Sequence, residues 1–264
     1  MKIKSLCAVS LLAVLGLSLT NGGSVLAADP AAPLVGDGTV TVEEGTTIDP
    51  TDPTPDPEKP GEVIVDPTEP GIKPNPSKGS MGIERVSTLD FGTIKTSSST
   101  ITKSAKELTW TPEGGTEQKR GTFVVFNDVR ANETYGYDIQ AKLTKQFTTS
   151  IESVDKTLAN SEITYSNAHL DPVKGNTNVA PSSVTPSFTL ALNEAKTVVV
   201  ADKAEKEGKG QYTLEFGRSA NYDGTNGTAD SAKDSVQLSI PSATASSMNT
   251  GAYAAEITWT MVAN

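Results

Sequence analysis

The clearest alternation of apolar and polar positions runs through residues 251–262, near the C-terminal end of the chain. Five residues of one parity are apolar: Tyr253, Ala255, Ile257, Trp259 and Met261. The opposite parity carries Glu256, Thr258 and Thr260. This period of two is typical of a half-buried β-strand. We therefore predict a final strand that is interior or barrel-closing, not a dispensable edge.

Shorter stretches with the same period recur from residue 83 onward, and turn-forming Gly, Pro, Asn, Asp and Ser separate them. The expected strands cover residues 83–91, 108–111, 122–126, 135–147, 187–192, 197–201, 211–216 and 235–240. No segment shows a sustained helical stripe, and residues 204–207 form at most one helical turn. Many short strands without alternating helices predict an all-β fold, an antiparallel β-sandwich of immunoglobulin-like or jelly-roll-like type.

Residues 28–79 have a different composition. Between residues 29 and 80 there are 11 acidic and 3 basic residues, frequent prolines and no aromatic residue, whereas all 14 aromatics lie between Phe91 and Trp259. Proline removes backbone donors, and like charges repel, so such a segment buries little apolar surface. We expect a disordered, acidic, Pro-rich linker over 28–79 and a folded domain over 80–264.

The first 27 residues have the features of a secretory signal peptide. Lys2 and Lys4 precede a largely apolar run from Leu6 to Leu19, and small residues permit cleavage before Ala28. The run is too short and interrupted to predict a membrane span. Cys7, the only cysteine, lies inside this segment, so the processed chain is expected to have no disulfide and no cysteine metal site.

Candidate catalytic chemistry is sparse. There is no G-x-S-x-G motif, and the single histidine, His169, lies beside Asp171 in an expected loop. Because Asp and Glu are abundant, a glycosidase-type pair of catalytic carboxylates is an alternative, although the sequence indicates no particular residue for it. The oxygen-rich stretch 221–230 lacks the spacing of a calcium loop and is expected to be an ordinary loop. We expect no enzyme activity, no metal and no cofactor, and the net charge of −10 argues against nucleic acid as a partner.

Several stretches of the chain form a set of motifs. They are Leu89-Asp90-Phe91-Gly92, Asn127-Asp128-Val129-Arg130, residues 136–144, residues 210–216, residues 236–241, Gly251-Ala252-Tyr253 and Ile257-Thr258-Trp259-Thr260-Met261. Together these motifs resemble the WxL domain, a cell-surface-binding module of low-GC Gram-positive bacteria. The resemblance covers most of residues 80–264.

The WxL family carries two Trp-x-Leu motifs, and both are altered here. The second is Trp259-Thr260-Met261, in which methionine conserves the volume of leucine. The first, judged by its flanks, is Tyr137-Asp138-Ile139. Trp110-Thr111-Pro112 is a rival for the first motif, but the flanking sequences favour Tyr137. By resemblance, the wall-binding motif consists of the six residues Tyr137, Asp138, Ile139, Trp259, Thr260 and Met261.

The resemblance implies a secreted protein held non-covalently on the cell wall, on peptidoglycan, together with membrane-anchored surface proteins as partners. An adhesin or surface-complex subunit that binds a partner protein is the alternative, and a wall hydrolase comes third. By parity, Tyr137, Ile139, Trp259 and Met261 face the core. Binding would then use neighbouring loops or the opposite face, which includes Asp138 and Thr260; an exposed aromatic patch is the minority interpretation.

Overall fold

The computed structural model describes residues 34–47, 49–65 and 71–264. The predicted signal peptide, its cleavage site and Cys7 lie outside these residues. Residues 42–264 form one compact unit, and residues 34–41 belong to a separate unit. None of the helices in the described residues is long and apolar enough to cross a membrane.

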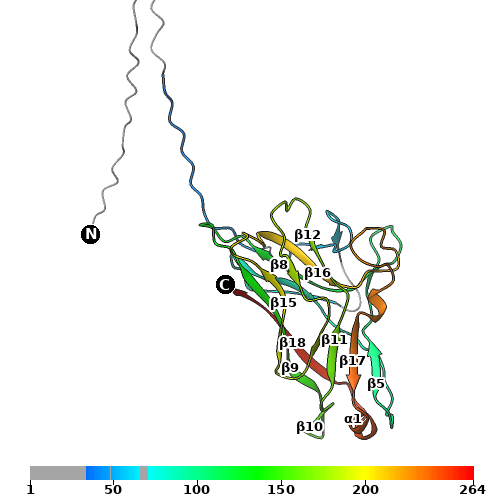
Figure 1. Ribbon diagram of the computed structural model, residues 1–264. Helices are drawn as coiled ribbons and strands as arrows, with labels where there is room; N and C mark the ends of the chain where they lie inside the picture. Colours follow the sequence, from blue (N-terminus) through cyan, green and yellow to red (C-terminus); the bar gives the residue numbers. More distant parts are fainter. Residues whose placement is uncertain (1–33, 48, 66–70) are drawn as a thin grey trace, which may run out of the picture. The chain divides into compact units, whose positions relative to one another are not determined.

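The described chain is almost entirely β-structure, as predicted (Figure 1). Its only helical elements are η1 (Ala232–Asp234) and the short helix α1 (Ser242–Ser247). The strands are β1 (Thr54–Pro55), β2 (Val63–Ile64), β3 (Ile72–Pro74), β4 (Met81–Ser87), β5 (Ile101–Ser104), β6 (Leu108–Trp110), β7 (Gln118–Arg120), β8 (Thr122–Asp128), β9 (Tyr137–Ile151), β10 (Val154–Thr157), β11 (Glu162–Tyr165), β12 (Ala168–Pro172), β13 (Ser183–Val184), β14 (Phe188–Leu190), β15 (Ala195–Ala201), β16 (Gly210–Phe216), β17 (Val236–Ile240) and β18 (Ala254–Ala263).

Three larger sheets and two small strand pairs make up the architecture. One sheet has the order β10-β9-β15-β13, with β18 also paired to β9; a second has the order β12-β16-β8-β4-β3; a third has the order β14-β11-β17-β5. The pairs β1-β2 and β6-β7 stand apart. Every ladder between these strands is antiparallel. The predicted antiparallel β-sandwich is confirmed, and the sheets do not close into a barrel.

One main core lies between the three larger sheets. It contains alternate residues of β9, β16 and β17, the strands with the clearest period of two. A smaller second cluster contains Ile64, Leu108, Trp110, Phe123 and Val125. Strand β8 is buried at every position because Phe126 faces the main core while Phe123 and Val125 face the second cluster.

The segment expected to be a linker takes part in this second cluster. Ile64 of β2 is 2% exposed. Asp56 accepts two hydrogen bonds of 2.6 Å from the buried guanidinium of Arg120, and Glu58 lies 3.3 Å from the same group. In the structure these residues are therefore packed and paired, which differs from the disordered linker expected over 28–79. Composition suggested self-repulsion, but the carboxylates meet arginines from distant parts of the chain, and such charge-assisted pairs offset the ordering entropy.

The final strand is also placed differently from the prediction. Strand β18 pairs with β9 and, among the described residues, with no second strand. It is thus an edge strand, neither interior nor barrel-closing. Its alternation is as predicted: Ile257, Trp259 and Met261 are half-buried against the main core, and the residues between them are exposed.

Candidate functional site

The two altered Trp-x-Leu motifs meet on the β9–β18 ladder. Met261 lies directly opposite Ile139, Trp259 opposite Ala141, and Val262 opposite Asp138. The register is regular from Ile257 to Ala263, with irregularities only between Ala254 and Ile257. Long-range strand pairing therefore brings together two motifs that lie far apart in the sequence.

The first motif contributes mainly to the core. Tyr137 and Ile139 are 0% exposed. The Tyr137 hydroxyl donates a hydrogen bond of 3.1 Å to the Gly208 carbonyl oxygen, and burial raises the pKa of this phenol above its usual range. Gly208 has φ +88°, and a Cβ there would stand 2.6 Å from the tyrosine ring, so the ring and the glycine fit each other closely. The packing role inferred from parity is confirmed for Tyr137.

Trp259 lies at the border between core and surface. Its indole packs against Tyr165 with ring centroids 5.9 Å apart and planes at 90°. Phe188 and Phe216 complete the aromatic cluster, at 6.3 and 6.0 Å. Edge-to-face packing of this kind stabilises aromatic clusters. The ring is nevertheless half-buried and lines two surface cavities, so it is both a packing residue and part of a groove.

The outer face of the β9–β18 ladder is polar. Thr258 and Thr260 are exposed on β18, beside Gln140 and Lys142 of β9. The Thr258 hydroxyl lies 3.0 Å from that of Thr144. Asp138 accepts a hydrogen bond of 3.2 Å from the Asn264 amide. Lys142 has no carboxylate partner within the described part of the chain. This outer face offers hydroxyls, amides and one cation without a carboxylate partner on a two-stranded antiparallel ladder.

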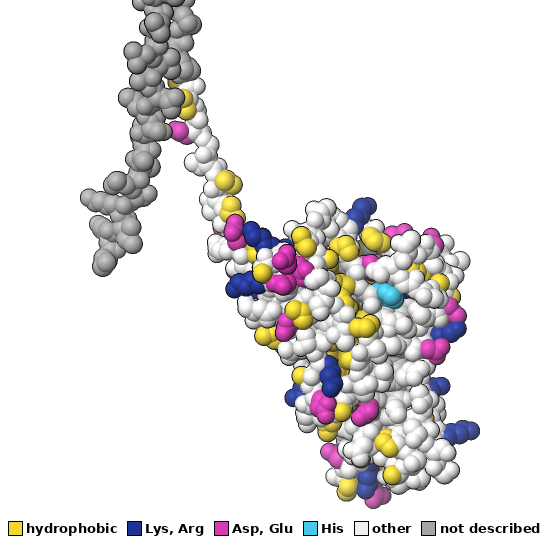
Figure 2. All heavy atoms as spheres, viewed as in Figure 1, with side chains coloured by type: hydrophobic (Ala, Val, Ile, Leu, Met, Phe, Trp, Pro, Cys, Tyr) yellow, Lys and Arg dark blue, Asp and Glu magenta, His cyan; other side chains and the backbone are white. Residues whose placement is uncertain are grey.

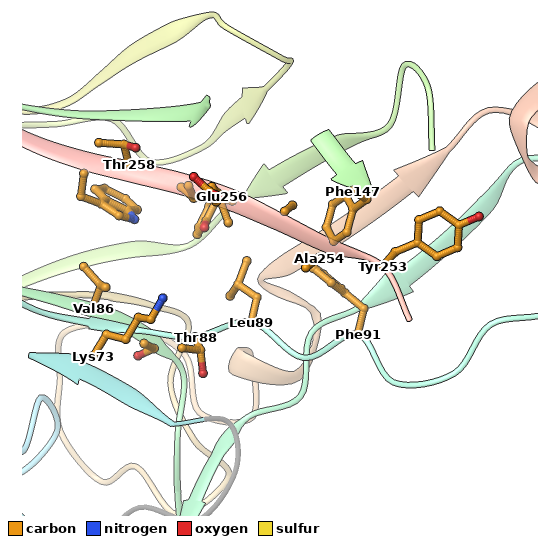
Figure 3. Close-up of a pocket in the computed structure, with 15 residues that line it drawn as sticks. Lys73, Val86, Thr88, Leu89, Phe91, Phe147, Tyr253, Ala254, Glu256 and Thr258 are labelled. Atoms are coloured by element: carbon orange, nitrogen blue, oxygen red, sulfur yellow. The ribbon is translucent and has the colours of Figure 1, made fainter. Parts of the chain in front are cut away.

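The inner side of β18 borders a groove (Figure 3). Lys73, Val86, Thr88 and Leu89 lie across the groove from the stretch of β18 that contains Glu256 and Thr258. One cavity of about 480 Å³ follows the strand from Tyr253 to Trp259. A second cavity of about 540 Å³ continues it toward Gly251. The two share four lining residues, Leu89, Phe91, Phe147 and Tyr253, so we treat them as one groove, the β18 groove.

The weak catalytic and metal candidates have structural roles. His169 lies in β12 rather than in a loop, opposite Glu215, and burial followed by the nearby Arg218 lowers its pKa. The Asn226 backbone oxygen accepts a hydrogen bond of 2.8 Å from Arg218 Nε. In the described ranges, no His, Cys, Asp and Glu side chains gather into a group able to hold a metal ion. On the visible face in Figure 2, charges of both signs are interspersed.

Similarity to known proteins places this β-sandwich among surface-binding domains. A family model described as "WxL domain surface cell wall-binding" matches residues 33–264. The chain therefore belongs to the WxL family of cell-wall-binding surface domains. The match includes the part of the Pro-rich segment that contains the buried residues Asp56 and Ile64. No curated protein matched the chain, and neither did any solved structure.

Proposed function

We propose that this protein is a secreted, non-enzymatic surface protein that attaches non-covalently to peptidoglycan through the outer face of the β9–β18 ladder. The observation that carries the proposal is the pairing of the two family motifs in one register. This pairing buries Tyr137 and Ile139 and leaves Thr260 exposed and Asp138 half-buried on the outer face.

The chemistry of this outer face suits a wall polymer. Peptidoglycan presents sugar hydroxyls and amides together with carboxylates of its peptide stems. Threonine hydroxyls and the Gln140 amide offer hydrogen bonds to the first two, and Lys142 offers a positive charge to the carboxylates. A rigid sheet holds these groups without a further loss of conformational entropy on binding. The aromatic rings then support the ladder from below instead of touching the polymer.

The test is sedimentation with purified, protein-stripped sacculi, using the chain without residues 1–27. Lys142→Glu is expected to reduce the bound fraction about tenfold, since one reversed contact of roughly 1.4 kcal/mol has that effect. Lys103→Glu is the matched control, because Lys103 is exposed on β5 in a different sheet. Equal binding of both variants would move the site elsewhere.

The alternatives give different results in the same assay. A subunit that recognises a partner protein would sediment with sacculi only after a membrane-anchored surface protein is added. A wall hydrolase would release soluble sugar from the sacculi. Either result would overturn the proposal.

A further inference from the structure

The free edge of β18 is unusual for a sheet edge. Its backbone pairs with β9 on one side, and within the described residues no strand is hydrogen-bonded to the other side, although β4 lines a cavity with it. Residues 257–263 contain no charged side chain and no bulge. Natural edge strands are usually protected by charges, proline, bulges or a covering segment, because a bare edge is a template for strand addition. Only Glu256 and the irregular register before Ile257 give such protection here.

The β18 groove lies directly beneath this edge. Its walls are largely apolar, with Phe91, Phe147 and Tyr253 along its length. Lys73 of the β3–β4 ladder lines it as well, and its side chain has neither an ion pair nor a hydrogen bond to the described residues. An added strand would therefore find apolar contacts for one face and a positive charge beside it.

The same chain carries a strand-like segment with nothing packed on it. Residues 39–44 read Thr-Val-Thr-Val-Glu-Glu, a period of two built from β-branched residues. Val40 and Val42 are 88% and 82% exposed. The segment runs as an extended chain (Figure 1), and the structure assigns it no ladder. At its end, Glu44 accepts a hydrogen bond of 3.2 Å from the Ala131 amide.

We propose that residues 39–44 of one copy add to the free edge of β18 in a second copy, as an antiparallel strand. Val40 and Val42, which share one parity, enter the β18 groove, and the acidic end of the segment lies near Lys73. Strand addition gives affinity through main-chain hydrogen bonds and specificity through alternate side chains.

A second copy is the occupant because each chain supplies both the donor segment and the acceptor edge, with opposite charges. The two surfaces are different, so the contact is heterologous and is repeated from copy to copy. The outer face proposed for peptidoglycan binding stays open, which would let an assembled array hold the wall at several points.

The first test is sedimentation velocity of the chain without residues 1–27 over a range of concentrations. The wild type is expected to form dimers and larger species as its concentration rises. Val40→Asp with Val42→Asp should weaken association at least about tenfold. Because both valines are exposed, this change leaves the fold intact. Val35→Asp is the matched control, since Val35 is 83% exposed and lies outside the alternating segment. A wild type that stays monomeric, or association that survives the double change, overturns the proposal.

The second test locates the contact by disulfide formation. Without Cys7 the chain has no thiol, so Thr41→Cys in one sample and Thr258→Cys or Thr260→Cys in another report only new contacts. Mixing under mild oxidation is expected to give a covalent dimer with one of the two β18 variants, and none when Val40→Asp and Val42→Asp are added. Absence of a mixed dimer overturns the proposal. A chain that carries both cysteines gives one further outcome. A crosslink that forms only within that chain also overturns the proposal, because the segment would then cover its own β18.

Discussion

At the scale of single residues, Tyr137 shows that a motif residue can act through the core. Tyr137→Phe keeps the ring but leaves the buried Gly208 carbonyl without its donor. We expect it to lower the free energy of unfolding by about 1–2 kcal/mol.

Trp259→Ala is expected to lower the free energy of unfolding by about 2 kcal/mol. This is less than the cost of truncating a fully buried aromatic residue, because Trp259 is only half-buried. Urea unfolding measures both, and an unchanged Tyr137→Phe variant would contradict the role assigned to the hydroxyl.

Glu215 gives the protein a defined dependence on pH. It is 0% exposed and lies 2.6 Å from Arg218. Burial, with Glu58 nearby, raises its pKa to about 8 from the ordinary value of 4.5. The folded state therefore holds this proton more tightly than the unfolded state does. The free energy of unfolding is highest below the unfolded pKa and falls as pH rises from about 4.5 to about 8.

Thermal unfolding from about pH 5.5 to about pH 8.5 tests this dependence, and Glu215→Gln is expected to remove the fall in stability with rising pH. His169, whose pKa is lowered by burial, contributes in the opposite direction within this window. Asp128 also acts in the opposite direction. Burial raises its pKa, but hydrogen bonds from Arg130 and Lys209 outweigh burial and hold the pKa below its usual value. Its contribution is therefore lost only in more acidic solution, below the chosen window. A flat wild-type profile would contradict the assignment.

At the scale of elements, strands with a long period of two could be predicted from the sequence. The expected strand over 135–147 is observed as β9 (Tyr137–Ile151), and that over 211–216 as β16. The short strands β11 and β12 were not predicted, because their sequences contain too little alternation. Strand β11 has four residues, and β12 contains Asp171 and Pro172, which favour a loop. The motif itself was found by resemblance. The register that pairs Met261 with Ile139 depends on long-range contacts, which no local pattern encodes.

The final strand is expected to be necessary for folding even though it is an edge. A chain ending at Thr250 loses five apolar residues packed on the core, Tyr253, Ala255, Ile257, Trp259 and Met261. It also leaves one side of β9 without a ladder partner from Tyr137 to Thr148, and unpaired edges promote aggregation. We predict an insoluble or unfolded product, measured by circular dichroism and thermal melting. A chain ending at Val262 is the control, and a cooperative transition in the shorter chain near that of the intact protein would make β18 an appendage.

At the scale of the whole molecule, the acidic Pro-rich segment is held by three arginines that composition could not connect to it, Arg85, Arg120 and Arg218. Arg120 pairs with Asp56 and Glu58 and lies over the Trp110 ring, 5.0 Å from its centre. Glu58 also accepts a hydrogen bond of 2.6 Å from the Ser219 hydroxyl. Arg218 reaches Pro57 through a longer bond of 3.4 Å. The segment thereby covers the second face of β8 and becomes part of the folded domain.

This arrangement predicts slow hydrogen exchange where a spacer would exchange at once. The Asp56 amide donates to the Glu62 carbonyl at 3.1 Å, so it is expected to be protected in the wild type. Arg120→Ala leaves two buried carboxylates unpaired, a change that typically costs about 3–5 kcal/mol. We expect the segment to detach and its amides to exchange rapidly, while the amides of β9 stay protected. Lys78→Ala is the control, because its pair with Asp49 is largely exposed and contributes little. Rapid exchange at Asp56 in the wild type would restore the interpretation of residues 28–79 as a disordered linker.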